Sequence, residues 1–506
     1  MHIKLSRFTA ATLLGIWLNG CAILDNMTKD YNPQTTISAV KLPAAWQAPL
    51  PHDGSIRNLN EFWQRYPQPV LLDFIIQAQA HAANVATAVA NIAEARENRI
   101  KAQATLLPKV DGKLSATRSL DQPENITVKG GGGFGINNSI SNSVQSNLSA
   151  TWEIDLLGSQ RANRNATIAQ EKAAEAKWHE ARVSVAAEVA TSYFNFVLCR
   201  QQSELQEQVQ FSSEISSNLT NVAYQVGFKD AGELALAISN FADAKQEAKN
   251  QAAQCEVEVK NLTALTNYDE TTVRQKLAEA HNSTPQLDLN SLFIIEEIPA
   301  NAIRQRPDVY RAEVDLIRSA ANVKQAAADR LPKVSLDGSI GWMRNSNAFF
   351  ESKGRVWSLG PIQLTLPIFD GGALKATQAT AEARYQEAAT AYRGAVQKAI
   401  KETETALVNL HTTGDRELDM VDSLERLSAH LKFAEAKQKA GFVSKLEVEE
   451  SRRNLLQAQK NAMSLQLERA NAWLNLYRAA GGGWQSGAVD TINISGLSTD
   501  NKLGID

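Results

Sequence analysis

The sequence predicts a mixed, mainly α chain in which long coiled-coil helices are combined with strands of membrane-crossing length. Residues 159–226 and 373–440 contain no proline, and at about 1.5 Å per residue each stretch would form ~100 Å of helix. Four other stretches alternate apolar and polar side chains over about the 9–11 residues that a tilted membrane strand requires. Because compact globular domains rarely contain helices this long, we expect a coiled-coil barrel rather than a globule.

Composition excludes two classes of protein. The chain has 506 residues, 43% hydrophobic and 21% charged, with a formal net charge of −3. This apolar content is sufficient for a core, so wholesale disorder is excluded. No basic excess is available to release counterions, which argues against nucleic acid as a partner. Beyond residue 20 no apolar run reaches the ~20 residues of a membrane helix, so any membrane crossing would use strands.

The N-terminus has the pattern of an export signal. A basic start precedes the apolar residues 8–18, which are too few for a membrane anchor. Leu18-Asn19-Gly20-Cys21 follows and resembles a bacterial lipoprotein box, which implies a signal peptide over residues 1–20 and lipidation of Cys21. Ala22 lacks the acidic character that such signals use for retention in the inner membrane, so the resemblance favours the outer membrane. The alternative is an ordinary secretory signal with a chance cysteine.

The other two cysteines are expected to pair. Cys199 and Cys255 both lie on apolar seams with 4-3 spacing, and their mean position is that of Gly227, a glycine in an evident turn. Folding two antiparallel helices back at Gly227 places Cys199 opposite Cys255. We therefore predict a disulfide across a helical hairpin, since an exported chain meets an oxidising compartment. The alternative is two buried free thiols.

The chain contains an internal repeat. Leu107-Pro108-Lys109-Val110 recurs as Leu331-Pro332-Lys333-Val334, and Val226-Gly227-Phe228 recurs as Ala440-Gly441-Phe442. Each half follows the order helix, two strands, very long helix, tight turn and long helix. We expect the repeats to span residues 62–285 and 286–484. A lipid-anchored, extended segment (21–61) would precede them and a flexible polar tail (485–506) would follow.

Four strands from one chain cannot close a barrel. They would leave two exposed edges, which proteins avoid, so closure requires several chains that each contribute four strands. A soluble sheet with one wet face would show the same alternation and is the alternative.

Catalytic chemistry has little support in the sequence. The seven histidines are scattered without metal-ligand spacing, and no nucleophile elbow is present. The glycine run 130–133 is not followed by the Lys-Ser or Lys-Thr of a phosphate-binding loop. We expect no enzyme activity, no cofactor and no metal.

Several motifs together resemble those of the TolC-like outer membrane efflux channels, in the lipoprotein branch called NodT-like. The match covers roughly residues 62–484. The motifs are Arg306-Pro307-Asp308-Val309 with Ala312-Glu313, Trp152-Glu153-Ile154-Asp155, Leu366-Pro367-Ile368-Phe369-Asp370-Gly371-Gly372 and Gly481-Gly482-Gly483-Trp484.

The resemblance implies a homotrimer in the outer membrane of a Gram-negative bacterium. Twelve strands, four per chain, would form one transmembrane β-barrel, and the helices would continue it as a periplasmic tunnel. Such channels dock on a periplasmic adaptor and an inner-membrane RND-type pump. They passively conduct what the pump ejects, here drugs or other toxic small molecules. The alternatives are a structural envelope lipoprotein and a periplasmic adaptor, neither of which needs two strand pairs of membrane length.

The resemblance also assigns roles to particular residues. The two turns match the family's adaptor-contacting tips, formed here by Val226, Gly227, Phe228, Gly441, Phe442 and Val443. These glycines could equally be simple helix C-caps. Glu447 and Glu450 match the acidic residues that narrow the tunnel's periplasmic end, although Ser444 and Glu447 also fit a capping box. By alternation, Glu153, Asp155 and Asp337 should face the barrel lumen, or simply be solvated.

Overall fold

The computed structural model describes residues 27–43, 46–48, 68–121, 139–283, 306–347 and 351–483, together with Leu24 and Ile303. The signal peptide expected over residues 1–20, the lipidation site Cys21 and the tail expected over residues 485–506 lie outside the described residues. The chain divides into two compact units. The first comprises Met1–Val40, Asn91–Ala174 and Ala312–Tyr392, and the second comprises Lys41–Ala90, Glu175–Arg311 and Arg393–Asp506.

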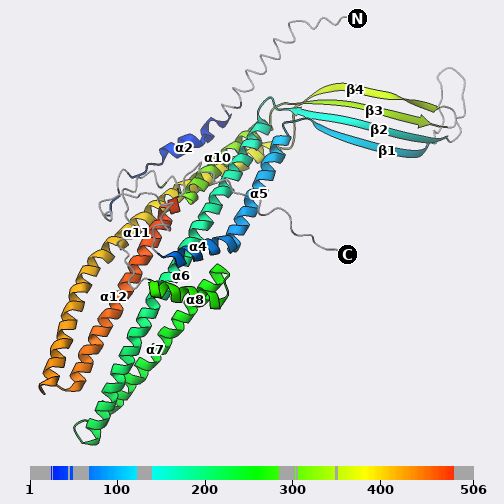
Figure 1. Cartoon of the computed structure of the whole chain (residues 1–506). Helices are drawn as coiled ribbons and strands as arrows, with labels where there is room; N and C mark the ends of the chain where they lie inside the picture. The colour runs from blue at the N-terminus through cyan, green and yellow to red at the C-terminus, as the bar shows by residue number, and fades with distance from the viewer. Residues whose placement is uncertain are drawn as a thin grey trace, which may run out of the picture. The chain divides into compact units, whose positions relative to one another are not determined.

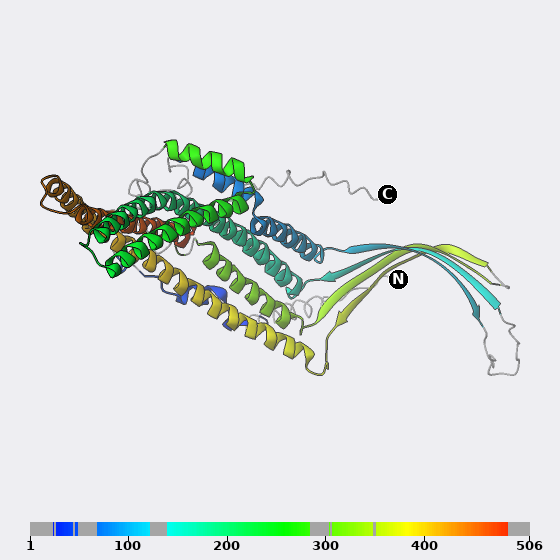
Figure 2. The same ribbon diagram turned by 90° about the horizontal axis from the view of Figure 1, so that it is seen from below.

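The first unit contains one antiparallel sheet that takes two strands from each repeat (Figures 1 and 2). The sheet order is β1-β2-β3-β4. The strands are β1 (Lys109–Asp121), β2 (Ser139–Ile154), β3 (Lys333–Ser346) and β4 (Glu351–Thr365). They lie side by side in one curved layer, with a register shift where Leu336 and Gly338 of β3 meet β4.

The register separates an apolar face from a polar one. Directly paired residues point to the same side of a sheet. One row of paired residues contains Leu148, Ile340 and Trp357 and lies on the apolar face. The next row contains Ser149, Ser339 and Ser358 and lies on the opposite, polar face. The apolar face is solvent-exposed in the single chain, because Leu114 is 78% and Leu359 81% exposed. An exposed apolar surface of this kind indicates contact with lipid or with another protein.

Two helices of 67 residues each dominate the chain, α6 (Ser159–Gln225) and α11 (Ala373–Lys439). Each ends one residue before the end predicted from the proline-free stretches. Gly227 and Gly441, which follow, have φ of 80° and 82°, so they terminate the helices by adopting the left-handed conformation that L-residues avoid.

The remaining helices complete the repeat. They are α4 (Pro69–His81), α5 (Ala83–Ala104), α7 (Ala231–Thr266), α8 (Glu270–Ser283), α10 (Pro307–Ala328) and α12 (Lys445–Ala479). The largest described core of the second unit gathers α4, α8, the middle of α6 and the end of α7 around Phe74, Tyr193 and Leu262, each at most 1% exposed. No described helix has both the length and the hydrophobicity needed to span a membrane.

The N-terminal segment, expected to be extended, is partly helical. It contains a 3₁₀ turn (Lys29–Tyr31) and the helix α2 (Pro33–Ala39). Asn32 caps α2 by accepting a hydrogen bond from the Gln34 N–H at 3.0 Å, and Pro33 occupies the first helical position, where proline is tolerated. The Tyr385 hydroxyl donates to the Asn32 carbonyl at 3.1 Å and holds this start on α11. Within the segment expected to be extended, a proline therefore initiates a helix.

Candidate functional site

The two helical hairpins end in the same turn motif. In the α6–α7 turn the Phe228 N–H donates to the Ala223 carbonyl at 2.8 Å, and the Gly227 N–H donates to Tyr224 at 3.0 Å. In the α11–α12 turn the equivalent bonds join Phe442 to Lys437 at 2.9 Å and Gly441 to Gln438 at 3.0 Å. Both are Schellman motifs, which satisfy the last carbonyls of the incoming helix.

The turns present aromatic side chains to solvent. Phe228 is 84% and Phe442 81% exposed, although phenylalanine is usually buried. Val226 is also exposed, whereas Val443 is half-buried against the core of its own hairpin, formed by Leu431, Ala434 and Val448. Each chain therefore exposes two phenylalanine side chains at equivalent positions of the two repeats.

Each outgoing helix has an N-cap. Asp230 and Glu233 form a complete capping box at the start of α7. At the start of α12 the Ser444 Oγ accepts a hydrogen bond from the Glu447 N–H at 3.3 Å. Among the described contacts the Glu447 carboxylate does not accept the reciprocal hydrogen bond from the Ser444 N–H, so the Glu447 side chain is available for another role.

The first turns of α12 carry three carboxylates with different surroundings. Glu447 and Glu450 are exposed and their carboxylates have no ion-pair partner among the described residues. Glu449 is 1% exposed and lies 2.9 Å from Lys445 Nζ and 3.5 Å from Arg452 Nε. The sequence analysis missed Glu449, whose i,i+4 and i,i+3 spacing to these cations was the available signal.

A groove of about 600 Å³ separates α12 from the α6–α7 hairpin and includes Glu450 and Arg453 in its lining. Arg453 crosses it, because its Nη1 donates to Ser216 Oγ at 2.6 Å and to Ser212 Oγ at 3.3 Å. Lys460 makes a second link, with its Nζ 3.2 Å from Glu247 Oε1. These polar contacts connect hairpins that the two repeats contribute separately.

Cys199 of α6 and Cys255 of α7 form a disulfide in the structure, with their Cα atoms 5.6 Å apart. This separation is ordinary for a disulfide. Cys199 is 8% exposed, so the bond lies inside the hairpin.

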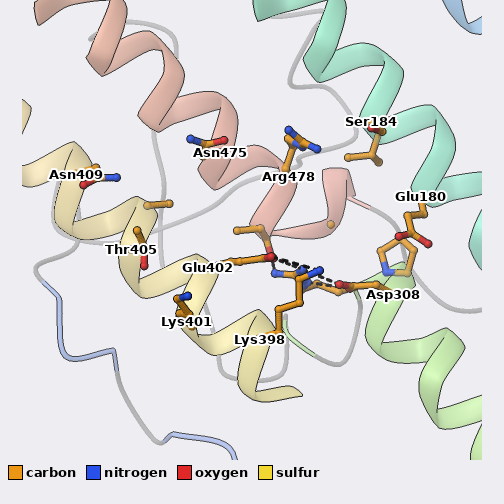
Figure 3. Close-up of a pocket in the computed structure, with 16 residues that line it drawn as sticks. Glu180, Ser184, Asp308, Lys398, Lys401, Glu402, Thr405, Asn409, Asn475 and Arg478 are labelled. Atoms are coloured by element: carbon orange, nitrogen blue, oxygen red, sulfur yellow. Dashed lines mark hydrogen bonds and ion pairs between the residues drawn. The ribbon is translucent and has the colours of Figure 1, made fainter. Parts of the chain in front are cut away.

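Arg306 is the centre of a polar cluster beside a cavity of about 720 Å³. Its partners Asp308 and Glu402 are labelled in Figure 3. Its Nε and Nη2 donate to the two Asp308 oxygens at 3.0 and 2.8 Å, and Nη2 also donates to Glu402 at 2.6 Å. Nη1 donates to the Ala479 carbonyl at 3.1 Å. Arg306 thus joins the start of α10 to α11 and to the end of α12.

The charges in this cluster stabilise one another. Burial would raise the pKa of the Asp308 carboxyl, but the hydrogen bonds and the charge of Arg306 outweigh it and lower that pKa. Burial likewise opposes the charge on Arg306, and its two carboxylate partners nevertheless raise its pKa. Sequence reasoning identified the Arg306-Pro307-Asp308 motif but not Glu402, which is 96 positions away.

The closing glycines pack directly against this cluster. Gly481 and Gly482 have φ of 76° and 63°. A Cβ on Gly481 would lie 3.1 Å from Arg306 Cα, and one on Gly482 would lie 2.4 Å from Val183 Cγ2. The motif therefore reflects close backbone packing as well as backbone conformation. Trp484 lies outside the described residues.

The acidic residues expected on the polar strand face divide into two groups. Glu153 pairs with Ser335 and Asp337 pairs with Thr151, so both lie on the polar face of the sheet. Asp155 is a correction, because β2 ends at Ile154 and the Asp155 carboxylate accepts from the Arg161 N–H at 2.9 Å and Nε at 3.1 Å. The start of α6 attracts the anion, and this interaction overrides the alternation of the strand.

The described residues contain no group of three or more His, Cys, Asp or Glu side chains that could hold a metal ion. The features that stand out in the described residues are exposed turns, an apolar strand face and interhelical charge clusters.

Comparison with known proteins agrees with this arrangement. The family model "Outer membrane efflux protein" matches residues 74–268 and 298–482. A pyoverdine export outer membrane protein, OpmQ of Pseudomonas putida, is 28% identical over 90% of this chain and 94% of its own length. A toluene efflux pump outer membrane protein, TtgI of the same species, is 24% identical over 93% and 97%.

Solved structures show the same fold. The CmeC outer membrane channel of Campylobacter jejuni superimposes with a TM-score of 0.75 at 24% identity, covering 90% of this chain and 94% of that one. The MtrE outer membrane channel of Neisseria gonorrhoeae, in its open state, gives 0.70 at 25% identity, covering 88% and 96%. The chain belongs to the outer membrane efflux protein family and is a non-enzymatic outer-membrane channel component of a tripartite efflux system of Gram-negative bacteria.

Proposed function

We propose that three copies of this chain form one channel, in which twelve strands close a barrel in the outer membrane. The edge strands support this assembly. β1 and β4 are the two edges of the described sheet and have 13 and 15 residues. Unpaired backbone groups are costly in lipid, so β1 of one copy must pair with β4 of the next. The polar face, with Glu153 and Asp337, would then line the lumen.

The helical tips dock on a periplasmic adaptor that connects the channel to an inner-membrane RND-type pump. The observation that carries this proposal is the pair of Schellman turns with exposed Phe228 and Phe442. Three chains would present six phenylalanines in a ring. Aromatic side chains are favoured anchors at protein interfaces. Gly227 and Gly441 set the turns, and Val226 and Val443 flank the anchors.

Glu447 and Glu450 form a constriction at this end of the tunnel. Both carboxylates are exposed and unpaired among the described residues of one chain. Three chains would bring six carboxylates together, which attracts cations and opposes close approach unless the charges are protonated or bound.

The conducted substrates are small molecules delivered by the pump, such as drugs or other toxic compounds. The relatives named for pyoverdine export and for toluene efflux support this class. Lipidation of Cys21 would add an outer-membrane anchor beside the barrel, which the Leu18-Asn19-Gly20-Cys21 pattern supports.

Dye efflux tests the proposal. Cells that lack other outer-membrane channels but contain the pump and the adaptor would receive the wild-type chain, F228D/F442D or F228L/F442L. We expect efflux with the wild type and the leucine variant, because both keep an apolar anchor. The aspartate variant should reach the outer membrane but abolish efflux.

Equal efflux by all three variants would exclude the tips as the docking site. Dye retention with the wild-type chain, across a panel of dyes and drugs, would favour a structural envelope role instead.

A further inference from the structure

Basic side chains occur on the apolar face of the sheet at the end where residues 122–138 and 348–350 connect the strands. Arg355 shares a row with Leu114 and Trp342, and Lys353 shares the next row with Ala116, Val144 and Arg344. Arg118 follows in the row after that, paired with Asn142. We call Arg118, Arg344, Lys353 and Arg355 the basic rim; all four are exposed.

The polar face carries no charge at the same level. Its rows there contain Ser115, Gln145, Met343 and Gly354, and then Thr117, Ser143, Asn345 and Ser352. A requirement for hydration alone would place the cations on this polar face. Their position on the opposite face therefore indicates a binding partner outside the sheet.

The basic rim begins where the apolar band ends. From the row of Ile154 and Val334 to the row of Ser146 and Trp342 the strands extend about 27 Å, close to the ~25 Å apolar band of outer-membrane proteins. Trp357 and Trp342 occupy the last two rows of this band and are 77% and 40% exposed. Tryptophan is typical of the boundary between hydrocarbon and headgroups.

Most of the basic charge is uncompensated. Arg344 Nε lies 2.8 Å from Glu351 Oε1. Arg118, Lys353 and Arg355 have no carboxylate partner among the described residues. A cation on a lipid-facing strand is destabilising unless it reaches an anion or water, so these three cations at the edge of the apolar band must reach either water or anionic headgroups.

We propose that the basic rim binds the phosphates of a phosphorylated glycolipid in the outer leaflet. The proposal rests on the proposed channel, which directs the loop end of the strands to the outside of the cell. Charge complementarity selects this occupant: arginine binds phosphate bidentately, and phosphates on a sugar headgroup lie just above the acyl chains that the Trp342 row contacts.

Lipid binding to the purified trimer tests this. The probes are diphosphoryl lipid A, its dephosphorylated form and phosphatidylglycerol, and the readout is affinity measured by native mass spectrometry or fluorescence. We expect K353Q/R355Q to weaken diphosphoryl lipid A binding about tenfold or more. The matched control K109Q/K113Q removes two cations from the polar face of β1 and should leave binding unchanged.

The wild-type protein gives a second measurement that needs no variant. Its affinity for diphosphoryl lipid A should fall with salt, and the dephosphorylated form should bind far more weakly. The proposal would be overturned if K353Q/R355Q and K109Q/K113Q lost equal affinity for diphosphoryl lipid A. It would also be overturned if the wild type bound the dephosphorylated form equally well or preferred phosphatidylglycerol. Dye efflux by K353Q/R355Q in cells reports on the channel separately, so failure of lipid binding leaves the proposed function testable on its own.

Discussion

At the residue scale, the Arg306 guanidinium is buried and its donors are divided among Asp308, Glu402 and the Ala479 carbonyl. An arginine fits this position because its planar fork meets both oxygens of Asp308 at once, whereas a lysine would supply a single ammonium. The cluster fixes the first residues of α10 against the end of α12, so the first helix of the second repeat depends on it.

We expect R306Q to destabilise the protein by about 3–5 kcal/mol, because it leaves the Asp308 carboxylate buried without its partner. The control is R318Q on the same helix, where Arg318 pairs with Asp315 at 3.0 Å on the surface and the loss should be below ~1 kcal/mol. Chemical denaturation followed by far-UV circular dichroism measures both. Similar losses would show that burial of the ion pair is unimportant.

Two glycines with positive φ distinguish the two costs of an added side chain, which are backbone strain and steric overlap. An added Cβ at Gly227 meets nothing within 4 Å, whereas one at Gly482 would meet Val183 at 2.4 Å. We expect G227A to lose only about 1–2 kcal/mol from the left-handed conformation, and G482A to lose more because Val183 must also move. Thermal unfolding of the two variants checks the order, and a smaller loss for G482A would contradict the packing argument.

At the element scale, proline-free length and the turn glycines were sufficient to predict α6 and α11 to within one residue. The strand faces also followed from alternation. Asp155 did not follow it, because this residue lies one position beyond β2 and its carboxylate accepts a hydrogen bond from the first turn of α6. Glu402 could not be identified in advance, since its partner Arg306 is brought close only by the tertiary packing. The spacing of Glu449 to Lys445 and Arg452 was visible in the sequence, but its burial was not.

The Cys199–Cys255 disulfide is an element-scale prediction, since it joins α6 to α7 across 56 positions of sequence. Closing a loop of this length restricts the unfolded chain, and we expect C199A/C255A to lose up to ~4 kcal/mol. Denaturation with and without reductant measures the effect.

Reductant should lower the stability of the wild type and leave the stability of C199A/C255A unchanged. The variant therefore controls for effects of the reductant that do not involve the disulfide. Alkylation of both thiols in the unreduced, denatured wild type would instead establish two buried free cysteines.

At the scale of the whole molecule, the sequence could indicate that several chains close the barrel, but the contact between chains depends on the strand edges. We expect a cysteine at Ser115 of β1 to cross-link to a cysteine at Ser352, Gly354, Val356 or Ser358 of β4 in the next copy. These positions lie on the polar face of their strands, and directly opposed side chains on one face are within reach. Oxidation should give a covalent trimer on a denaturing gel.

The control pairs a cysteine at Ser115 with one at Met343 of β3, an inner strand of the sheet. This pair should give no trimer, because β4 lies between Met343 and β1 of the next copy, and β2 separates the two positions within a chain. Absence of a covalent trimer for every β4 position would contradict closure through β1 and β4.

The carboxylates at the start of α12 give the assembled channel a measurable property. Glu447 and Glu450 have no partner within the described part of one chain, whereas Glu449 is buried with Lys445 and Arg452. In the proposed channel the first two carboxylates would therefore be free to act on ions, whereas Glu449 is held by two cations of its own helix. We expect E447Q/E450Q to conduct better and to lose selectivity for cations over anions in planar bilayers, because six fixed negative charges leave the constriction.

E270Q on α8 is the matched control, since Glu270 pairs with Lys260 and Arg274 and its removal should leave selectivity unchanged. If E447Q/E450Q kept the selectivity of the wild type, the narrowest part of the conducting path would have to lie elsewhere, and Glu447 would be left with the role of a helix-start residue.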